Sequence, residues 1–208
     1  MEKYNSYESL SLEEKKVSLS DYYKRLQQAI LELPFNDLQK ALDMIEDAYK
    51  NHKKFFIIGN GGSHATASHF VADMTKTIFG KSPIEGIKRH PFVVECLSDN
   101  VPTLTAVGND LPNGYNEIFS LPLYAKASEG DLLLVITGSG NSGNIVRALE
   151  VAKEMNLQTI WFLWFDGWAA KDMVDHSVIV DSKDYGIIED MHSSYMHAIT
   201  DYFKKSIK

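Results

Sequence analysis

The pattern of apolar and polar positions divides the chain into a helical N-terminal part and a longer part in which short strands alternate with helices. Apolar residues recur at helical spacing over residues 18–33 and again over residues 36–50. Pro34 separates these two predicted helices, and Asn36 is a candidate N-cap for the second. Residues 1–16 are charged and aperiodic, so we predict a tail there. Two amphipathic helices of this kind can pack as a bundle between subunits.

Beyond residue 50, short apolar segments are each followed by a loop and, in most cases, by a helical pattern. We predict strands at 55–58, 92–97, 132–136, 159–164 and 177–180, and helices at 63–78, 101–107, 144–155 and 186–205. Continuous apolar strands that alternate with helices indicate a parallel sheet covered on both faces. The predicted fold is therefore one α/β domain over residues 1–208. It has a doubly wound, flavodoxin-like sheet of five parallel strands in residues 51–208 and a helical pair for oligomer packing in residues 1–50.

Composition and charge narrow the functional classes. The 208 residues are 44% hydrophobic, enough for one domain with a substantial core. The net charge of −7 argues against a nucleic-acid-binding protein, which would present a basic face. No apolar run approaches the roughly 20 residues of a membrane span, and the polar N-terminus resembles no targeting peptide. Cys96 is the only cysteine, which fits a reducing compartment. We therefore expect a cytoplasmic protein with no membrane or nucleic-acid partner.

Two loops rich in glycine and hydroxyl residues follow the first and third predicted strands, at residues 59–63 and 137–144. In parallel sheets, ligands bind beyond the carboxyl ends of the strands, and the free N–H groups of the helices that follow attract anions. Neither loop has the P-loop or the dinucleotide fingerprint, so we expect no nucleotide cofactor. One such loop is typical of a tight turn with a hydroxyl cap. Two of them after separate strands of one sheet favour a phosphate site.

These loops and several further segments resemble the phosphoheptose isomerases, which belong to the sugar-isomerase (SIS) domain class. The matching segments are Phe56–Ser63, Ala67–Phe70, Ser98–Asn100, Leu104–Asp110, Glu129–Asp131, Ser139–Asn144 and Glu189–His192, together with His197. The resemblance covers nearly the whole chain from Leu38 to Lys205. Many SIS proteins share the glycine- and serine-rich segments, whereas the placements of His69 and His197 are more specific.

The resemblance implies an enzyme of carbohydrate metabolism. It implies conversion of the ketose sedoheptulose 7-phosphate to D-glycero-D-manno-heptose 7-phosphate, or to a glycero-manno-heptose of related configuration. This product feeds heptose synthesis for the cell surface, in capsule or lipopolysaccharide. The resemblance also implies a homotetramer with active sites at subunit interfaces, and a bound divalent metal, zinc.

The resemblance also assigns roles to individual residues. The substrate- and phosphate-binding positions would be Asn60, Gly61, Gly62, Ser63, Asn109, Asp110, Thr137, Gly138, Ser139, Ser142 and Glu189. The metal positions would be His69, Asp73, Glu189 and His197, of which Asp73, Glu189 and His197 would also be catalytic. Isomerisation through an enediol needs a base that moves a proton between adjacent carbons, and an acid or a metal that stabilises the oxyanion.

Helix geometry predicts that one pair of the four metal positions lies close together and that the other pair does not. His69 and Asp73 are four residues apart, so they project from one face of the predicted helix. Glu189 and His197 are eight residues apart, which is about 12 Å of helix rise and about 80° of net rotation. One regular helix therefore does not easily bring both to a single ion. A long glutamate reach, a distorted first turn or two subunits would be needed.

Four features depart from the family pattern, one of which is Gly167-Trp168 in place of a Gly-Gly pair. Asp73 stands where the phosphoheptose isomerases usually carry glutamate, and Glu189 where they usually carry glutamine. Gly138 replaces a hydroxyl residue. An extra carboxylate favours a cation in the site, because clustered carboxylates repel one another. These departures indicate a divergent branch and keep two alternatives open. One is a non-catalytic SIS protein that binds a sugar phosphate or a protein partner, and the other is an isomerase of another sugar phosphate.

Overall fold

A computed structural model of the chain describes residues 9–79, 92–138, 140–164 and 173–207. Its centre is a five-stranded sheet in the order β2-β1-β3-β4-β5, and every neighbouring pair is parallel. The strands are β1 (Phe55–Gly59), β2 (Val94–Cys96), β3 (Leu132–Ile136), β4 (Gln158–Trp164) and β5 (His176–Val180). This is the flavodoxin-like strand order, with its topological switch point between β1 and β3. The predicted fold class is confirmed.

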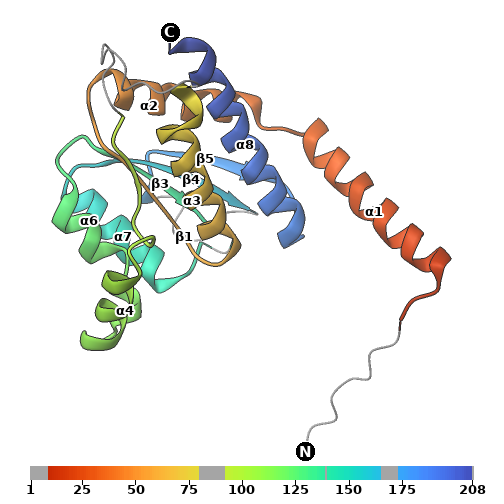
Figure 1. Ribbon diagram of the computed structural model, residues 1–208, viewed down its shortest axis with the longest axis horizontal. Coiled ribbons are helices and arrows are strands. Elements are labelled where there is room, and N and C mark those ends of the chain that lie inside the picture. The colour runs from red at the N-terminus through yellow and green to blue at the C-terminus, as the bar shows by residue number, and fades with distance from the viewer. Residues whose placement is uncertain (1–8, 80–91, 139, 165–172, 208) are drawn as a thin grey trace, which may run out of the picture.

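Helices cover both faces of the sheet, as Figure 1 shows. They are α1 (Leu12–Leu31), α2 (Phe35–Lys50), α3 (Gly62–Thr75), α4 (Val101–Asp110), α5 (Gly114–Glu117), α6 (Ser120–Lys126), α7 (Gly143–Glu154) and α8 (Tyr185–Ser206), with a 3₁₀ turn, η1, at Thr77–Phe79. Side chains alternate along β1. Phe55 and Ile57 pack with α2, α3 and α8, whereas Phe56 and Ile58 pack with α6 and α7. The sheet is therefore buried on both sides, which explains why its strands are apolar throughout.

The first helix begins earlier than its apolar period indicates, so the predicted tail over residues 1–16 is wrong for residues 12–16. A capping box starts α1. The backbone N–H of Ser11 donates to the Glu14 carboxylate at 2.9 Å, and the Glu14 N–H donates to the Ser11 hydroxyl at 3.3 Å. Hydrogen bonds at the cap define this boundary, whereas an apolar stripe appears only where the helix touches the core.

Asn36 is not the N-cap of α2, which corrects a second prediction. Pro34 takes that position, and its carbonyl accepts from the N–H groups of Asp37 and Leu38 at 3.1 and 3.0 Å. Asn36 already lies inside the helix. The short helices α5 and α6 were not predicted, because 4 and 7 residues are too few to display a helical period.

The helix α1 lies against α8 and extends away from the sheet (Figure 1). Tyr22 and Leu26 pack on the core, and Ala29 is the one buried residue of the helix. Much of the remaining apolar surface of α1 is exposed, at Leu12, Val17, Leu19, Tyr23, Ile30 and Leu31. Among the described residues, no helix combines the length and the apolar character that crossing a membrane requires.

Candidate active site

The two glycine- and hydroxyl-rich loops meet at the switch point of the sheet. Gly59, the last residue of β1, pairs with Ile136, the last residue of β3. A small pocket of about 140 Å³ opens beyond these ends. It is lined by Asn60, Ser63, Thr137, Gly138, Ser142, Tyr185, Ile188 and Glu189. Six of these eight are predicted substrate-binding residues, so the fold brings most of the expected phosphate site together.

Of the other five predicted binding residues, Gly61, Gly62, Asn109 and Asp110 do not line this pocket. Gly61 is the N-cap of α3 and has a φ of 56°, a conformation that favours glycine. Asn109 and Asp110 lie exposed at the carboxyl end of α4, where the Asn109 amide donates to the Asp110 carboxylate at 2.8 Å. Neither borders the pocket in the described part of the chain. Ser139 lies outside the described residues.

A pair of side-chain amides links the two loops. The Asn60 amide donates to the Asn144 oxygen at 3.1 Å, and the Asn144 amide donates back to the Asn60 oxygen at 3.0 Å. Asn144 is fully buried, and its bonds to Asn60 satisfy one donor and its acceptor. The pair therefore holds the N-terminus of α3 and that of α7 in fixed relation. Sequence reasoning missed it, because the two residues are 84 positions apart and neither signals its partner.

The Glu189 carboxylate lies against the first turn of α3. A Cβ atom placed on Gly62 would be only 2.3 Å from Oε1 of Glu189. Glycine at position 62 is therefore needed for close approach to the carboxylate. The free N–H groups at a helix N-terminus favour a negative charge there. Glu189 thus adds an anionic group to one wall of the pocket, beside the hydroxyls of Ser63 and Ser142.

A metal-capable group lies further along α3, where this helix runs beside α8. The hydroxyl oxygens of Thr66 and Ser193 are 3.3 Å apart and mark the contact between the two helices. Beyond this contact, ligand atoms of His69, Asp73 and His197 all lie within 4.8 Å of one another. His69 Nε2 is 3.9 Å from Asp73 Oδ2, and the rings of His69 and His197 are 5.2 Å apart between centroids.

This donor set fits a divalent metal. Zn²⁺ takes imidazole nitrogens and carboxylate oxygens, and two such ligands of one tetrahedral ion are about 3.3 Å apart. His69 and His197 are exposed, so open coordination positions face solvent. Glu189 is not a member of the group. Because α8 is continuous from Tyr185 to Ser206, Glu189 and His197 do not reach one ion within a single chain, so the predicted metal role of Glu189 would need a second subunit.

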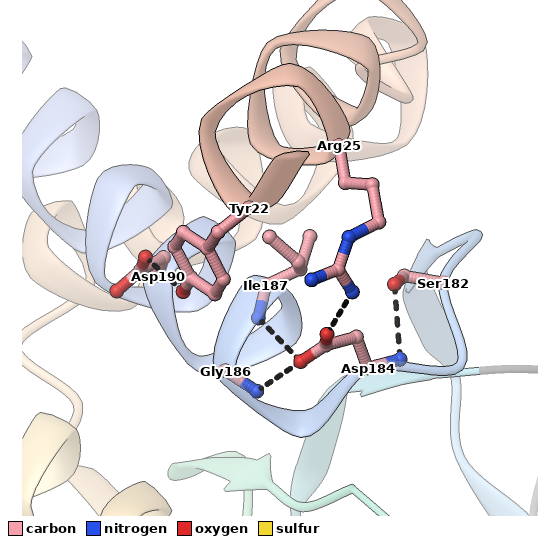
Figure 2. A network of polar contacts seen from close by, with 7 residues as sticks. All are labelled: Tyr22, Arg25, Ser182, Asp184, Gly186, Ile187 and Asp190. Atoms are coloured by element: carbon pink, nitrogen blue, oxygen red, sulfur yellow. Dashed lines mark hydrogen bonds and ion pairs between the residues drawn. The ribbon is translucent and has the colours of Figure 1, made fainter. Parts of the chain in front are cut away.

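Polar contacts from α1 fix the N-terminal turn of α8 (Figure 2). Asp184 caps α8, and its Oδ1 accepts from the N–H groups of Gly186 and Ile187 at 2.9 and 3.4 Å. The other oxygen pairs with Arg25, and this pairing holds the pKa of Asp184 below its ordinary value. The Tyr22 hydroxyl donates to Asp190 at 2.7 Å, which raises the pKa of Tyr22 to about 12. The turn that carries Glu189 to the pocket is therefore braced from outside.

His192 has a structural role. It is a fully buried residue of α8, with its ring 6.1 Å from that of Phe162. Burial lowers the pKa of His192 to about 4, because the charged imidazolium is disfavoured away from water. The side chain is thus neutral near pH 7. Its place in the sequence, five residues before His197, does not distinguish it from a site residue.

Comparison with known proteins identifies the class of this chain. A family model described as the SIS domain matches residues 20–163, more than half of the chain. The chain therefore belongs to the SIS domain family.

Within that class the chain belongs to the phosphoheptose isomerase family. It is 36% identical over 170 residues to the phosphoheptose isomerase of Citrifermentans bemidjiense, covering 82% of this chain and 84% of the relative. A relative of the same name from Aliarcobacter butzleri is also 36% identical, over 82% and 85% of the two chains. The solved phosphoheptose isomerase from Francisella tularensis superimposes with a TM-score of 0.81 at 28% identity, covering 92% of this chain and 98% of that one. The resemblance read from the sequence is confirmed.

Proposed function

We propose that this protein is a sugar-phosphate isomerase that converts sedoheptulose 7-phosphate to D-glycero-D-manno-heptose 7-phosphate. The observation that carries the proposal is the placement of three features along α3 and α8. A pocket lined with hydroxyls lies at the start of both helices, a carboxylate stands in its wall, and a metal-capable group follows further along α3. The names of the relatives, which match most of the chain, support the same activity.

The phosphate end of the substrate binds at the switch point. Ser63, Thr137 and Ser142 offer hydroxyls, and α3 and α7 offer the free N–H groups of their first turns. The Asn60–Asn144 amide pair holds these donors in place before the ligand arrives. A preformed site lowers the ordering cost of binding.

The sugar end of the substrate reaches towards Glu189 and the group on α3. Glu189 removes a proton from C1 of the ketose and returns it at C2, while a proton moves from the oxygen on C1 to the oxygen on C2. His69, Asp73 and His197 would hold a zinc ion, which as a Lewis acid would stabilise negative charge on the carbonyl oxygen. Because His197 is about 12 Å of helix rise from Glu189 in one chain, this arrangement needs the zinc group of a neighbouring subunit at the pocket.

The finer parts of the proposal concern assembly and location. We expect a homotetramer with active sites at subunit interfaces. The apolar side chains that α1 exposes support this, and so does the pocket of about 140 Å³, which is small for a seven-carbon sugar phosphate and invites completion by a second subunit. The single cysteine fits the cytoplasm, where heptose precursors of capsule or lipopolysaccharide would be made.

Turnover of sedoheptulose 7-phosphate by the purified protein, followed by NMR, tests the proposal. We expect conversion that is lost after treatment with a chelator and restored by Zn²⁺. Asp73→Asn should lower kcat/KM by about 10- to 100-fold, as loss of a metal ligand or its support does. Asp43→Asn makes the same chemical change on an exposed position of α2 and should leave the rate unchanged. Binding of the sugar phosphate without turnover would favour a non-catalytic protein. Turnover of a pentose or hexose phosphate alone would favour the other alternative, an isomerase of another sugar phosphate.

A further inference from the structure

A second set of metal-ligating side chains lies at the carboxyl end of β2. His64 comes from the first turn of α3, Cys96 is the last residue of β2, and Asp99 lies in the turn that follows. Ligand atoms of the three residues lie within 4.8 Å of one another. Cys96 Sγ is 3.5 Å from His64 Nδ1, and His64 Nε2 is 3.7 Å from Asp99 Oδ1. None of the three belongs to the phosphate pocket or to the group of His69, Asp73 and His197.

The spacing of the sulfur and the nitrogen matches a tetrahedral zinc site. With Zn–S at about 2.3 Å and Zn–N at about 2.0 Å, the two ligand atoms of one tetrahedral ion are about 3.5 Å apart. With Nδ1 as the ligand nitrogen of His64, the separation of 3.5 Å from the Cys96 sulfur therefore fits one ion. Asp99 lies nearest the opposite nitrogen, Nε2, so its side chain must turn towards the ion to complete the set. The mixture of thiol, imidazole and carboxylate is also the one that Zn²⁺ accepts most readily.

Neighbouring hydroxyl groups and a bordering cavity provide hydrogen bonds to the ligands and access for an ion. The Ser68 hydroxyl donates to Asp99 Oδ2 at 3.1 Å and would hold the carboxylate in place. The Ser98 hydroxyl lies 2.7 Å from His64 Nδ1 and 3.4 Å from the Cys96 sulfur. On cation binding this hydroxyl would rotate away or become the fourth ligand. A cavity of about 520 Å³ borders Cys96 and Asp99 and gives a path for entry.

We propose that His64, Cys96 and Asp99 bind a second divalent cation, for which Zn²⁺ is the best match. Cation binding would displace the thiol proton of Cys96, so binding should release protons and strengthen as the pH rises. Burial raises the pKa of Cys96 to about 11, so without a cation the thiol remains protonated near pH 7. Because His64 directly follows Ser63, a cation here would also place positive charge one residue from the phosphate pocket. The site does not depend on the proposed isomerase activity.

Cobalt(II) provides a test that separates the two metal-capable groups. The full-length protein, reduced and stripped of metal by a chelator, is titrated with Co²⁺ while near-ultraviolet absorbance is recorded. A thiolate bound to Co²⁺ gives a charge-transfer band, and Cys96 is the only cysteine of the chain. The band therefore reports this site alone. We expect the band to reach its full height when one Co²⁺ per chain has bound at this site. The band should disappear when Zn²⁺ is added.

Variants then identify the ligands. Cys96→Ser should abolish the band, His64→Asn and Asp99→Asn should each weaken Co²⁺ binding by at least about tenfold, and Ser68→Ala should weaken it by about tenfold. His197→Asn alters the other group and should leave the band unchanged. Circular dichroism checks that each variant is folded, and Asp99→Asn is an exposed change that the fold tolerates. Absence of the band in the wild-type protein would overturn the proposal. So would unchanged affinity in both the His64 and the Asp99 variant, which would mean that the thiol alone takes up the metal.

Discussion

Replacement of Gly62 by alanine would separate the stability of the fold from the geometry of the site. Gly62 is the first residue of α3 and its φ is not in the left-handed region, so the backbone accepts alanine. In a helix this change stabilises by up to about 1 kcal/mol. The new Cβ, however, would be 2.3 Å from Oε1 of Glu189 and 2.5 Å from its Cδ. The Glu189 carboxylate, at the end of a flexible side chain, must therefore move, because the helix backbone of α3 moves less easily.

The size of the effect follows from the contact distances. Ordinary contact begins at 3.4 Å, so the carboxylate must move by about 1 Å, a displacement that can cost about 100-fold in rate. We therefore expect Gly62→Ala to keep or raise the melting temperature while kcat/KM for the sugar phosphate falls by up to about 100-fold, or about 2.7 kcal/mol.

Gly108→Ala is a matched control, because a Cβ there would meet only Ile118 Cγ2 at 4.0 Å. Thermal unfolding and steady-state kinetics are measured on both variants. A Gly62→Ala variant with the wild-type kcat/KM would refute the role of the Glu189 position. Because Glu189→Ala should itself remove turnover, that background is compared by binding of inorganic phosphate, which Gly62→Ala should change there by less than about twofold, since the clash is gone. A larger loss of phosphate affinity in the Glu189→Ala background would show that alanine disturbs α3 itself.

Three further predictions test the elements around the site. Asn144→Ala leaves the Asn60 amide unpaired, so the free energy of unfolding should fall by about 1 to 3 kcal/mol and binding of inorganic phosphate should weaken; an unchanged urea midpoint would contradict this. Because burial holds the pKa of His192 near 4, below its ordinary value of 6.5, stability is complete above pH 6.5 and should fall by on the order of 3 kcal/mol as the pH drops towards 4. His192→Leu should flatten that part of the pH curve of chemical denaturation, and an identical curve would assign the loss to other groups. Arg25→Ala should raise the pKa of Asp184 in an NMR titration while the unfolding free energy changes little, since the pair is exposed. An unmoved pKa of Asp184 would show that the cap of α8 alone sets it.

The sheet could be predicted from the sequence because its strands are buried on both faces. Each strand appears as an uninterrupted apolar run, and every predicted strand lies within two residues of the observed one at each end. The phosphate pocket was predictable for a related reason. The carboxyl ends of β1 and β3 are neighbours in any sheet of this order, so the loops that follow them must meet. Short helices such as α5 carry too few residues for a period, and the start of α1 depends on a cap.

The remainder of the site depends on contacts that no local pattern encodes. Helix periodicity indicated that Glu189 and His197 do not easily reach one ion, although the resemblance grouped them, and only the packing of α8 on α3 places one at Gly62 and the other beside His69. In the sequence, Asn144 is an ordinary polar residue at the start of a helix. Its role becomes visible only from the hydrogen bond of its side chain to Asn60. The family pattern likewise gives no indication of the group at Cys96, whose ligands come from three separate segments.

The most direct test of the account is an NMR time course of sedoheptulose 7-phosphate with the zinc-loaded protein in D₂O. We expect that an aldoheptose 7-phosphate forms and carries deuterium at C2, because the proton moved by Glu189 exchanges with solvent during the enediol step. The signal should be lost in Glu189→Ala and retained in Asp43→Asn. An unchanged ketose with no deuterium at C1, from a protein that still binds inorganic phosphate, would contradict the isomerase assignment and leave a sugar-phosphate-binding protein in its place.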